Sequence, residues 1–173
     1  EVVLGITLSV TREFAPLIAG IFVAGRTASA VAARIGTMQV SQEIDALRVL
    51  GINPVRYLVS PLLAALLLTL PALTVLANFT ALLGGALYCA LSLNLPVVIF
   101  FERAAAILEV SDVLEGLSKS LVFAVNIALV GACNGFKVTA GAEGVGRATT
   151  RSVVLSIVYI IIIDAVFTYF LNR

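Results

Sequence analysis

The segment QVSQEIDALRVLGINPVRY, residues 39–57, interrupts an otherwise apolar chain with the pattern of one short helix. Ser41 is a suitable N-cap, because a serine hydroxyl accepts a hydrogen bond from a free backbone N–H of the first turn. Gly51 supplies the left-handed residue that often ends a helix, and the pair Asn53-Pro54 is typical of the start of the next one. The segment therefore predicts a helix, a tight stop and a second helix in direct succession.

The predicted helix, about residues 41–50, is too short to cross a membrane, because ten residues rise only about 15 Å, half of a bilayer's hydrocarbon core. Val40, Ile44 and Leu47 recur at helical spacing and form an apolar face. The opposite face is charged and carries Glu43, Asp45 and Arg48. Such a helix between two membrane segments lies outside the bilayer. Its apolar face is covered by lipid headgroups or by a partner protein, unless the helix is only a surface connector.

The composition is typical of a polytopic, all-α membrane protein. Of the 173 residues, 61% are hydrophobic and 12% are charged, and histidine is absent. Without histidine, a Ser-His-Asp triad and the usual zinc or haem sites are excluded, so we expect neither an enzyme nor a cofactor or metal. The stretch 141–147 lacks the lysine of a phosphate-binding loop and predicts only a flexible turn. Cys89 and Cys133 lie in separate apolar segments and are predicted to be buried free thiols.

The apolar runs predict a single membrane domain over residues 1–173 with four spans. The spans are expected over about residues 14–35, 57–91, 113–138 and 149–171, and a short interfacial helix over about 96–108. The first apolar run, Val2–Val10, is too short to cross and fits either the end of an earlier helix or an interfacial segment.

The distribution of basic residues predicts the sidedness of the connections. Three Lys or Arg side chains fall in each of the connections 34–56 and 137–151, against one in 92–115. The positive-inside rule therefore assigns the first and third connections to the cytoplasm and the second to the outside.

Three ionisable residues, Glu13, Lys119 and Asp164, lie next to or inside the apolar spans, all in the predicted outer half. An unpaired charge at mid-membrane costs at least about 2.5 kcal/mol, so such residues usually pair or face water. We predict that Lys119 pairs with one or both carboxylates. The set either pins helices together or forms a polar patch in a cavity for a polar or amphipathic solute. Arg26, deep in the first span, is likewise expected to face protein or water.

Small residues recur at every fourth position of the first span: Gly20, Ala24, Ala28, Ala32 and Gly36. Such a ridge lets another backbone approach closely. It fits either tight packing within the chain or a subunit interface, and the sequence leaves both open.

Several motifs match those of one known family, in order: Arg12-Glu13-Phe-Ala-Pro16, Ala24-Gly25-Arg26-x-x-Ser29-Ala30, Ile35-Gly36-Thr37-Met38, Ile44-Asp45-Ala46-Leu47, Gly51-Ile-Asn53-Pro54 and Gly144-x-Gly146-x-Ala148-Thr149-Thr150. Over essentially its whole length the chain resembles the MlaE-type (YrbE) permeases, the membrane subunits of MCE-associated ABC lipid transporters. Family members usually carry a further span ahead of the Arg-Glu motif, so we expect a missing N-terminal part and five spans in the full-length protein. The family's usual Ser-Pro-Arg reads Ser60-Pro61-Leu62 in this chain.

The resemblance implies a homodimeric permease that moves phospholipid-like lipids with energy from a separate ABC ATPase subunit. The short loop helix would be the coupling helix seated in the ATPase, through Glu43, Ile44, Asp45, Leu47 and Arg48. The lipid cavity would be lined near Arg12, Glu13, Lys119 and Asp164. An MCE-domain protein is implied as the outer partner, without nucleic acid, in the bacterial inner membrane or, as a second option, the chloroplast inner envelope. A passive channel or a membrane scaffold is the alternative function.

Overall fold

The structure, a computed structural model, describes residues 2–139 and 141–171, and every regular element in these ranges is a helix. In chain order the elements are α1 (Val2–Ser9), η1 (Val10–Phe14), α2 (Ala15–Val23), η2 (Ala24–Ala28), α3 (Ser29–Val40), α4 (Glu43–Val49), α5 (Pro54–Leu93), α6 (Val97–Ile107), α7 (Val110–Phe136) and α8 (Gly141–Leu171). Elements η1 and η2 are short π-helical segments, in which the backbone makes a wider turn than in an α-helix.

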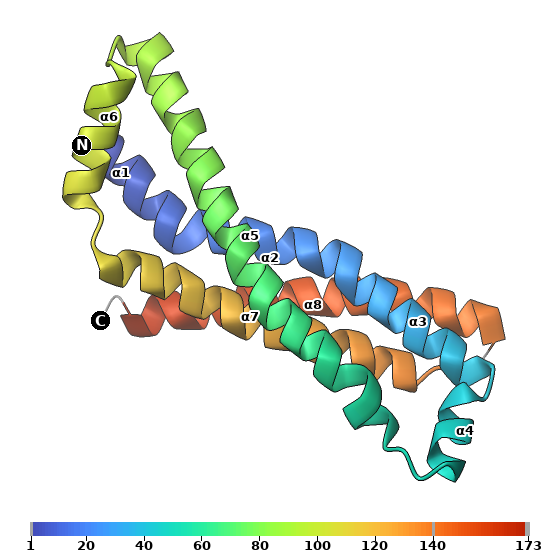
Figure 1. The fold of residues 1–173 in the computed structure, drawn as a ribbon. Helices are drawn as coiled ribbons and strands as arrows, with labels where there is room; N and C mark the ends of the chain where they lie inside the picture. The colour runs from blue at the N-terminus through green and yellow to red at the C-terminus, as the bar shows by residue number, and fades with distance from the viewer. Residues whose placement is uncertain (1, 140, 172–173) are drawn as a thin grey trace.

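Four helical runs are long and apolar enough to cross a membrane: Val2–Val40, Pro54–Leu93, Val110–Phe136 and Gly141–Phe170. The run from α2 to α3 packs beside α7 and α8, and α5 crosses this bundle obliquely (Figure 1). The short helix α4 lies at the same end of the bundle as the last turns of α7, and α6 lies at the opposite end. The prediction of an all-α polytopic protein with four spans in this chain is confirmed.

The first span begins earlier than predicted. Helix continues through Val2–Val40, so Arg12 and Glu13 lie inside the run and not ahead of it. Pro16 accounts for the π segment η1, because a proline ring clashes with the carbonyl of the residue four positions before it. The wider turn relieves this clash, and the Ala15 N–H donates to the Val10 carbonyl oxygen.

The ridge of small residues packs inside the chain. Ala24, Ala28 and Ala32 have no exposed surface. The facing helix α7 contributes two glycines: a Cβ added to Gly131 or Gly135 would lie 3.2 Å from a backbone carbonyl oxygen of the first span. Of the two alternatives that the sequence leaves open, the structure therefore has close packing within one chain.

Helix α4 starts later than predicted, because α3 continues almost to Ser41. The Ser41 hydroxyl donates to the Thr37 carbonyl oxygen at 3.0 Å, so it belongs to the end of α3 and does not cap α4. Gln42, in the left-handed conformation (φ 62°), makes the turn between them. The predicted stop and restart are confirmed: Gly51 is left-handed (φ 75°), and the Asn53 side chain accepts hydrogen bonds from the first turn of α5.

The second predicted span is one uninterrupted helix of 40 residues, α5, which includes Pro61 and Pro71. The short helix predicted over about residues 96–108 is present as α6, and it follows a short non-helical link at the far end of α5. The stretch 141–147 is not a flexible turn, because α8 begins at Gly141. Its Val145 approaches Gly36 of α3, so packing supports helix there.

The two cysteines differ in their environment. Cys89 is buried, as predicted, but Cys133 is exposed, and both thiols are free. The prediction of a second buried thiol is wrong because α7 buries only one face in the bundle, and Cys133 lies on the other.

Candidate functional site

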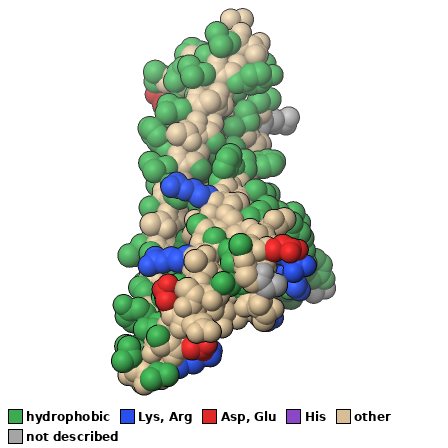
Figure 2. Space-filling model, turned by 90° about the vertical axis from the view of Figure 1, so that its right-hand side faces the viewer, with side chains coloured by type: hydrophobic (Ala, Val, Ile, Leu, Met, Phe, Trp, Pro, Cys, Tyr) green, Lys and Arg blue, Asp and Glu red, His purple; other side chains and the backbone are tan. Residues whose placement is uncertain are grey.

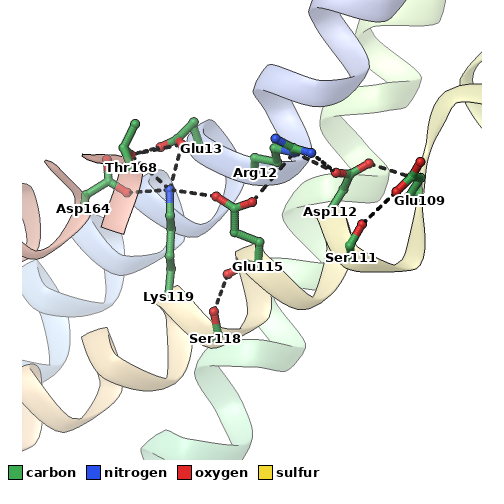
Figure 3. Close-up of polar contacts among 10 residues, drawn as sticks. All are labelled: Arg12, Glu13, Glu109, Ser111, Asp112, Glu115, Ser118, Lys119, Asp164 and Thr168. Carbon is green, nitrogen blue, oxygen red and sulfur yellow. Dashed lines mark hydrogen bonds and ion pairs between the residues drawn. The ribbon is translucent and has the colours of Figure 1, made fainter. Parts of the chain in front are cut away.

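Three helical runs bring their in-span polar side chains to one place (Figure 3). We define the charge cluster as the residues that meet there from η1, α7 and α8: Arg12, Glu13, Asp112, Glu115, Lys119, Asp164 and Thr168. The cluster lies in the half of the bundle that is farther from α4.

Lys119 of α7 is the centre of one half of the charge cluster. Its Nζ lies 2.8 Å from Oε1 of Glu13, 3.4 Å from Oδ1 of Asp164 and 3.9 Å from Oε1 of Glu115. The Thr168 hydroxyl accepts a hydrogen bond from Lys119 at 3.3 Å and donates to the Glu13 carboxylate at 3.1 Å. The predicted pairing of Lys119 is therefore confirmed, and it involves both carboxylates.

Arg12 of η1 is the centre of the other half. Its Nε donates to Oδ1 of Asp112 at 2.7 Å, and its terminal nitrogen forms an ion pair with the same oxygen. The second Asp112 oxygen accepts from the Glu109 N–H at 2.9 Å, in a capping box that starts α7. Glu115 joins the two halves, because its Oε2 lies 3.8 Å from Arg12 while its Oε1 faces Lys119.

A glycine of α7 permits this arrangement. A Cβ added to Gly116 would lie 2.5 Å from the carbonyl oxygen of Thr11. Any other residue at this position would force the two backbones apart. Thr11 directly precedes Arg12, and Gly116 directly follows Glu115. The close contact between their backbones therefore brings Arg12 and Glu13 within reach of the charged side chains of α7.

The charge cluster holds more carboxylates than cations, and its members differ in access. Buried charges of this kind are tolerated only when they are paired and hydrogen-bonded. Lys119 has no exposed surface, whereas 35% of the Arg12 side chain and 29% of the Glu13 side chain are exposed. The expectation that Lys119 lines a substrate cavity therefore does not fit its burial. Arg12 and Glu13 are the more accessible members of the charge cluster, and Lys119 pairs with Glu13 and Asp164 from inside the bundle.

Sequence reasoning missed Asp112, Glu115 and Thr168. The charge count assigns the first two to the connection before the third span, but the structure makes them the opening turns of α7. Their signal is spacing, because residues 112, 115 and 119 fall on one face of a helix, as do 164 and 168.

The apolar face predicted for the coupling helix is only partly covered by the chain itself, because Val40 is 44% exposed. Ile44 has no exposed surface and packs with Ile35 of α3 and Val59 of α5, and Leu47 is half-buried. The expectation that Ile44 needs lipid headgroups or a partner protein to cover it is therefore wrong. The connections on either side of α4 are short, so the helix folds back onto its neighbours.

The remaining surface of α4 is open. Glu43, Asp45 and Arg48 are exposed, and Arg48 pairs with Asp45 at 2.9 Å. Directly after them lie exposed apolar side chains that we call the α4 tip: Val49 (87% exposed), Leu50 (72%) and Ile52 (39%). Viewed toward the α4 end of the molecule, charged side chains gather over the lower part of the surface, and the part above is mostly hydrophobic (Figure 2).

Comparison with known proteins finds one family profile and several relatives, and the bacterial relatives are described as ABC transporter permeases. The sequence profile of the family described as Permease MlaE matches residues 2–170. A probable ABC transporter permease protein of Rickettsia typhi is 38% identical over 168 residues, which make up 97% of this chain and 65% of that protein. One from Synechocystis is 42% identical over 157 residues, 91% of this chain and 60% of the relative.

A plant relative matches over a similar range. The protein TRIGALACTOSYLDIACYLGLYCEROL 1, chloroplastic, of Arabidopsis thaliana is 39% identical over 165 residues, 95% of this chain and 47% of the relative. The chain thus spans less than two thirds of the length of each of these three proteins.

Proposed function

Because this chain belongs to the MlaE permeases, a family of ABC transporter membrane subunits, we propose that it moves phospholipid-like lipids with energy from a separate ATPase subunit. The observation that carries the proposal is the charge cluster, a set of ion pairs held between apolar helices with Arg12 and Glu13 partly open. Acyl chains require an apolar path, and a headgroup requires a few fixed polar groups along it.

The exposed pair Arg12 and Glu13 suits the two charges of a zwitterionic headgroup. Asp112 and Glu115 leave part of the Arg12 guanidinium's five N–H donors unused, and these can meet a phosphate. The Glu13 carboxylate can meet an ammonium group. The surplus of carboxylates in the charge cluster favours such a cation at its open side.

We assign the ATPase contact to the exposed surface of α4. It combines Asp45, Arg48 and the α4 tip, which is apolar and has no cover within the described residues. The positive-inside rule supports a cytoplasmic position for this end, since both connections richer in Lys and Arg lie there. In this scheme ATP hydrolysis in the partner moves α4, and this subunit carries out no ATP chemistry.

The further parts of the proposal follow from the family. They are a second copy of the chain, an MCE-domain protein at the α6 end, one permease domain over residues 1–173, and a location in the bacterial inner membrane or the chloroplast inner envelope. The relatives from Synechocystis and from the Arabidopsis thaliana chloroplast support these two locations.

The test is ATP-driven transfer of labelled phosphatidylethanolamine by the full-length protein reconstituted with its ATPase subunit. The double variant Glu13→Gln with Asp164→Asn should lose at least about tenfold in transfer rate while the complex still assembles. Glu143→Gln, at a carboxylate that is 80% exposed, is the matched control. Unchanged transfer in the double variant would refute the role of the charge cluster, and absence of transfer by the unaltered complex would refute the function.

A further inference from the structure

A fixed charge outside the charge cluster lies in the middle of the first span. Arg26 belongs to η2, its side chain is exposed, and no hydrogen bond or ion pair reaches its guanidinium from the described residues. Along the helix it lies about 20 Å from Glu13 and about 20 Å from Val40. An arginine keeps its charge, and an unpaired charge at such a depth is costly. Arg26 is therefore suited to pair with an anion, and the described residues do not supply one.

A groove of about 350 Å³ adjoins Arg26 between the first span and α5. Its lining is mostly apolar and includes Phe22, Val23, Leu66 and Leu73, with the hydroxyl-bearing Thr27 and Thr69 beside the arginine. Phe22 is 76% exposed at its edge. An arginine accompanied by hydroxyls suits a phosphate oxygen cluster, and the apolar walls suit acyl chains.

Arg26 and the exposed charges of the charge cluster share one backbone feature, since both lie in short π-helical segments of the first span. Arg12 and Glu13 lie in η1, and Arg26 lies in η2. Single π segments inside α-helices are frequent at functional sites. In η2 the altered turn is held by Ser29, whose hydroxyl donates to the carbonyl oxygens of Gly25 (2.8 Å) and Arg26 (2.9 Å).

A second copy of the chain offers no free carboxylate at this depth among the described residues. The carboxylates inside the spans already face Arg12 or Lys119: Glu13, Asp112, Glu115 and Asp164. The others lie on α4, in or beside α6, or at the start of α8: Glu43, Asp45, Glu102, Glu109 and Glu143. Charge complementarity therefore favours a lipid as the source of the anion.

We propose that Arg26, with Thr27 and Thr69, binds the phosphate group of a phospholipid in the groove between η2 and α5. This site is separate from the charge cluster and lies between it and the α4 end. The binding stands on the geometry of the groove, whereas the identity of the bound lipid as transported cargo rests on the proposed function.

The experiment uses the full-length protein in maltoside micelles, which contain no phosphate. The 173 residues contain no tryptophan, so Phe22→Trp adds a fluorophore at the edge of the groove. Phosphatidylglycerol with brominated chains quenches it by contact, and brominated diacylglycerol serves as the reference without phosphate. We expect half-maximal quenching at about tenfold lower mole fraction of phosphatidylglycerol than of diacylglycerol.

Variants in the same background identify the group responsible. Arg26→Gln should remove the preference for phosphatidylglycerol, and Arg26→Lys should retain part of it, which separates loss of the charge from loss of the fold. Arg56→Gln, at an exposed arginine outside the groove, should leave the preference unchanged.

Equal quenching by both lipids would overturn the proposal. So would a preference that survives Arg26→Gln, because a group other than the Arg26 guanidinium would then bind the phosphate. A preference that persists although ATP-driven transfer is absent would support the site and refute only the transport function.

Discussion

The Nζ atom of Lys119 in α7 lies 2.8 Å from Oε1 of Glu13 in η1, and the lysine side chain has no exposed surface. Asp164 of α8 lies 3.4 Å from the same nitrogen. One ammonium group thus connects three spans. Within a bilayer, helices gain little from hiding apolar surface from lipid, so polar contacts and close packing decide how they associate. The Lys119–Glu13 pair therefore fixes the arrangement of the bundle as well as the candidate site.

Replacement of the lysine removes the only cation in this half of the charge cluster. Lys119→Met leaves Glu13, Asp164 and Glu115 close together without a counter-charge, and should lower the free energy of unfolding by about 3 kcal/mol. Thermal unfolding in detergent measures the change. Lys137→Met, at an exposed lysine directly after α7, should stay within about 0.5 kcal/mol of wild type. Equal stability of the two variants would contradict the central role of Lys119.

A methyl group at Gly116 should separate η1 from α7. The added Cβ would lie 2.5 Å from the Thr11 carbonyl oxygen, so Gly116→Ala should cost about 1–3 kcal/mol of unfolding free energy. Gly84 of α5 is the matched control, because an added Cβ there meets no atom within 4 Å. Gly84→Ala should be neutral or stabilising by up to about 1 kcal/mol, since alanine favours helix. If both substitutions behave alike, the close contact at Gly116 is absent in the membrane.

The Thr168 hydroxyl should orient Glu13 toward the open side of the charge cluster. Thr168→Val keeps the shape of the side chain but removes the hydrogen bonds to Glu13 and Lys119, at a cost of about 1 kcal/mol in stability. The rate of lipid transfer should fall by more than this change in stability explains. Thr150→Val, whose hydroxyl reaches only the Gly146 carbonyl oxygen of its own helix, should leave transfer unchanged. Normal transfer by Thr168→Val would exclude an orienting role.

Two substitutions near α4 should separate partner binding from folding. Leu50→Asp changes the exposed α4 tip and should abolish co-purification of the ATPase with little change in the melting temperature of the permease. Ile44→Asp places a charge where no surface is exposed, and should destabilise the permease itself by several kcal/mol, about 3 or more. Co-purification and thermal unfolding of both variants provide the readout. Retention of the ATPase by Leu50→Asp would remove the α4 tip from the interface.

The features that sequence predicted correctly depend on local chemistry. Apolar length identifies the four spans, Gly51 and Asn53 mark the stop and restart around α4, and the cost of a lone ammonium in an apolar helix predicts that Lys119 is paired. Each of these follows from a short stretch of residues and its immediate solvent.

The features that sequence did not predict depend on how the helices pack. The run before Arg12 looks like a separate segment, because the charged pair interrupts the apolar pattern, but partners on α7 and α8 neutralise the pair inside the span. Which side of α4 is exposed also depends on tertiary contacts. The sequence alone does not decide whether Ile44 faces a partner protein or packs on α3 and α5 of the same chain. The π segments were also missed. Pro16 accounts for η1, and the Ser29 hydroxyl bonds to carbonyl oxygens of η2, but neither residue changes the spacing of apolar residues from which helices are predicted.

Helix α5 has a mechanical consequence. Its 40 residues extend about 60 Å, twice the thickness of a hydrocarbon core. Near its middle, Leu66, Leu70 and Thr74 are buried against the bundle. Short links connect one end of α5 to α4 and the other end to α6. If α5 tilts as a rigid rod about this middle stretch, a tilt of about 10° displaces each arm of about 30 Å by about 5 Å, in opposite directions. A push at one membrane surface would thus be felt at the other through a single continuous backbone, without any relay of side chains.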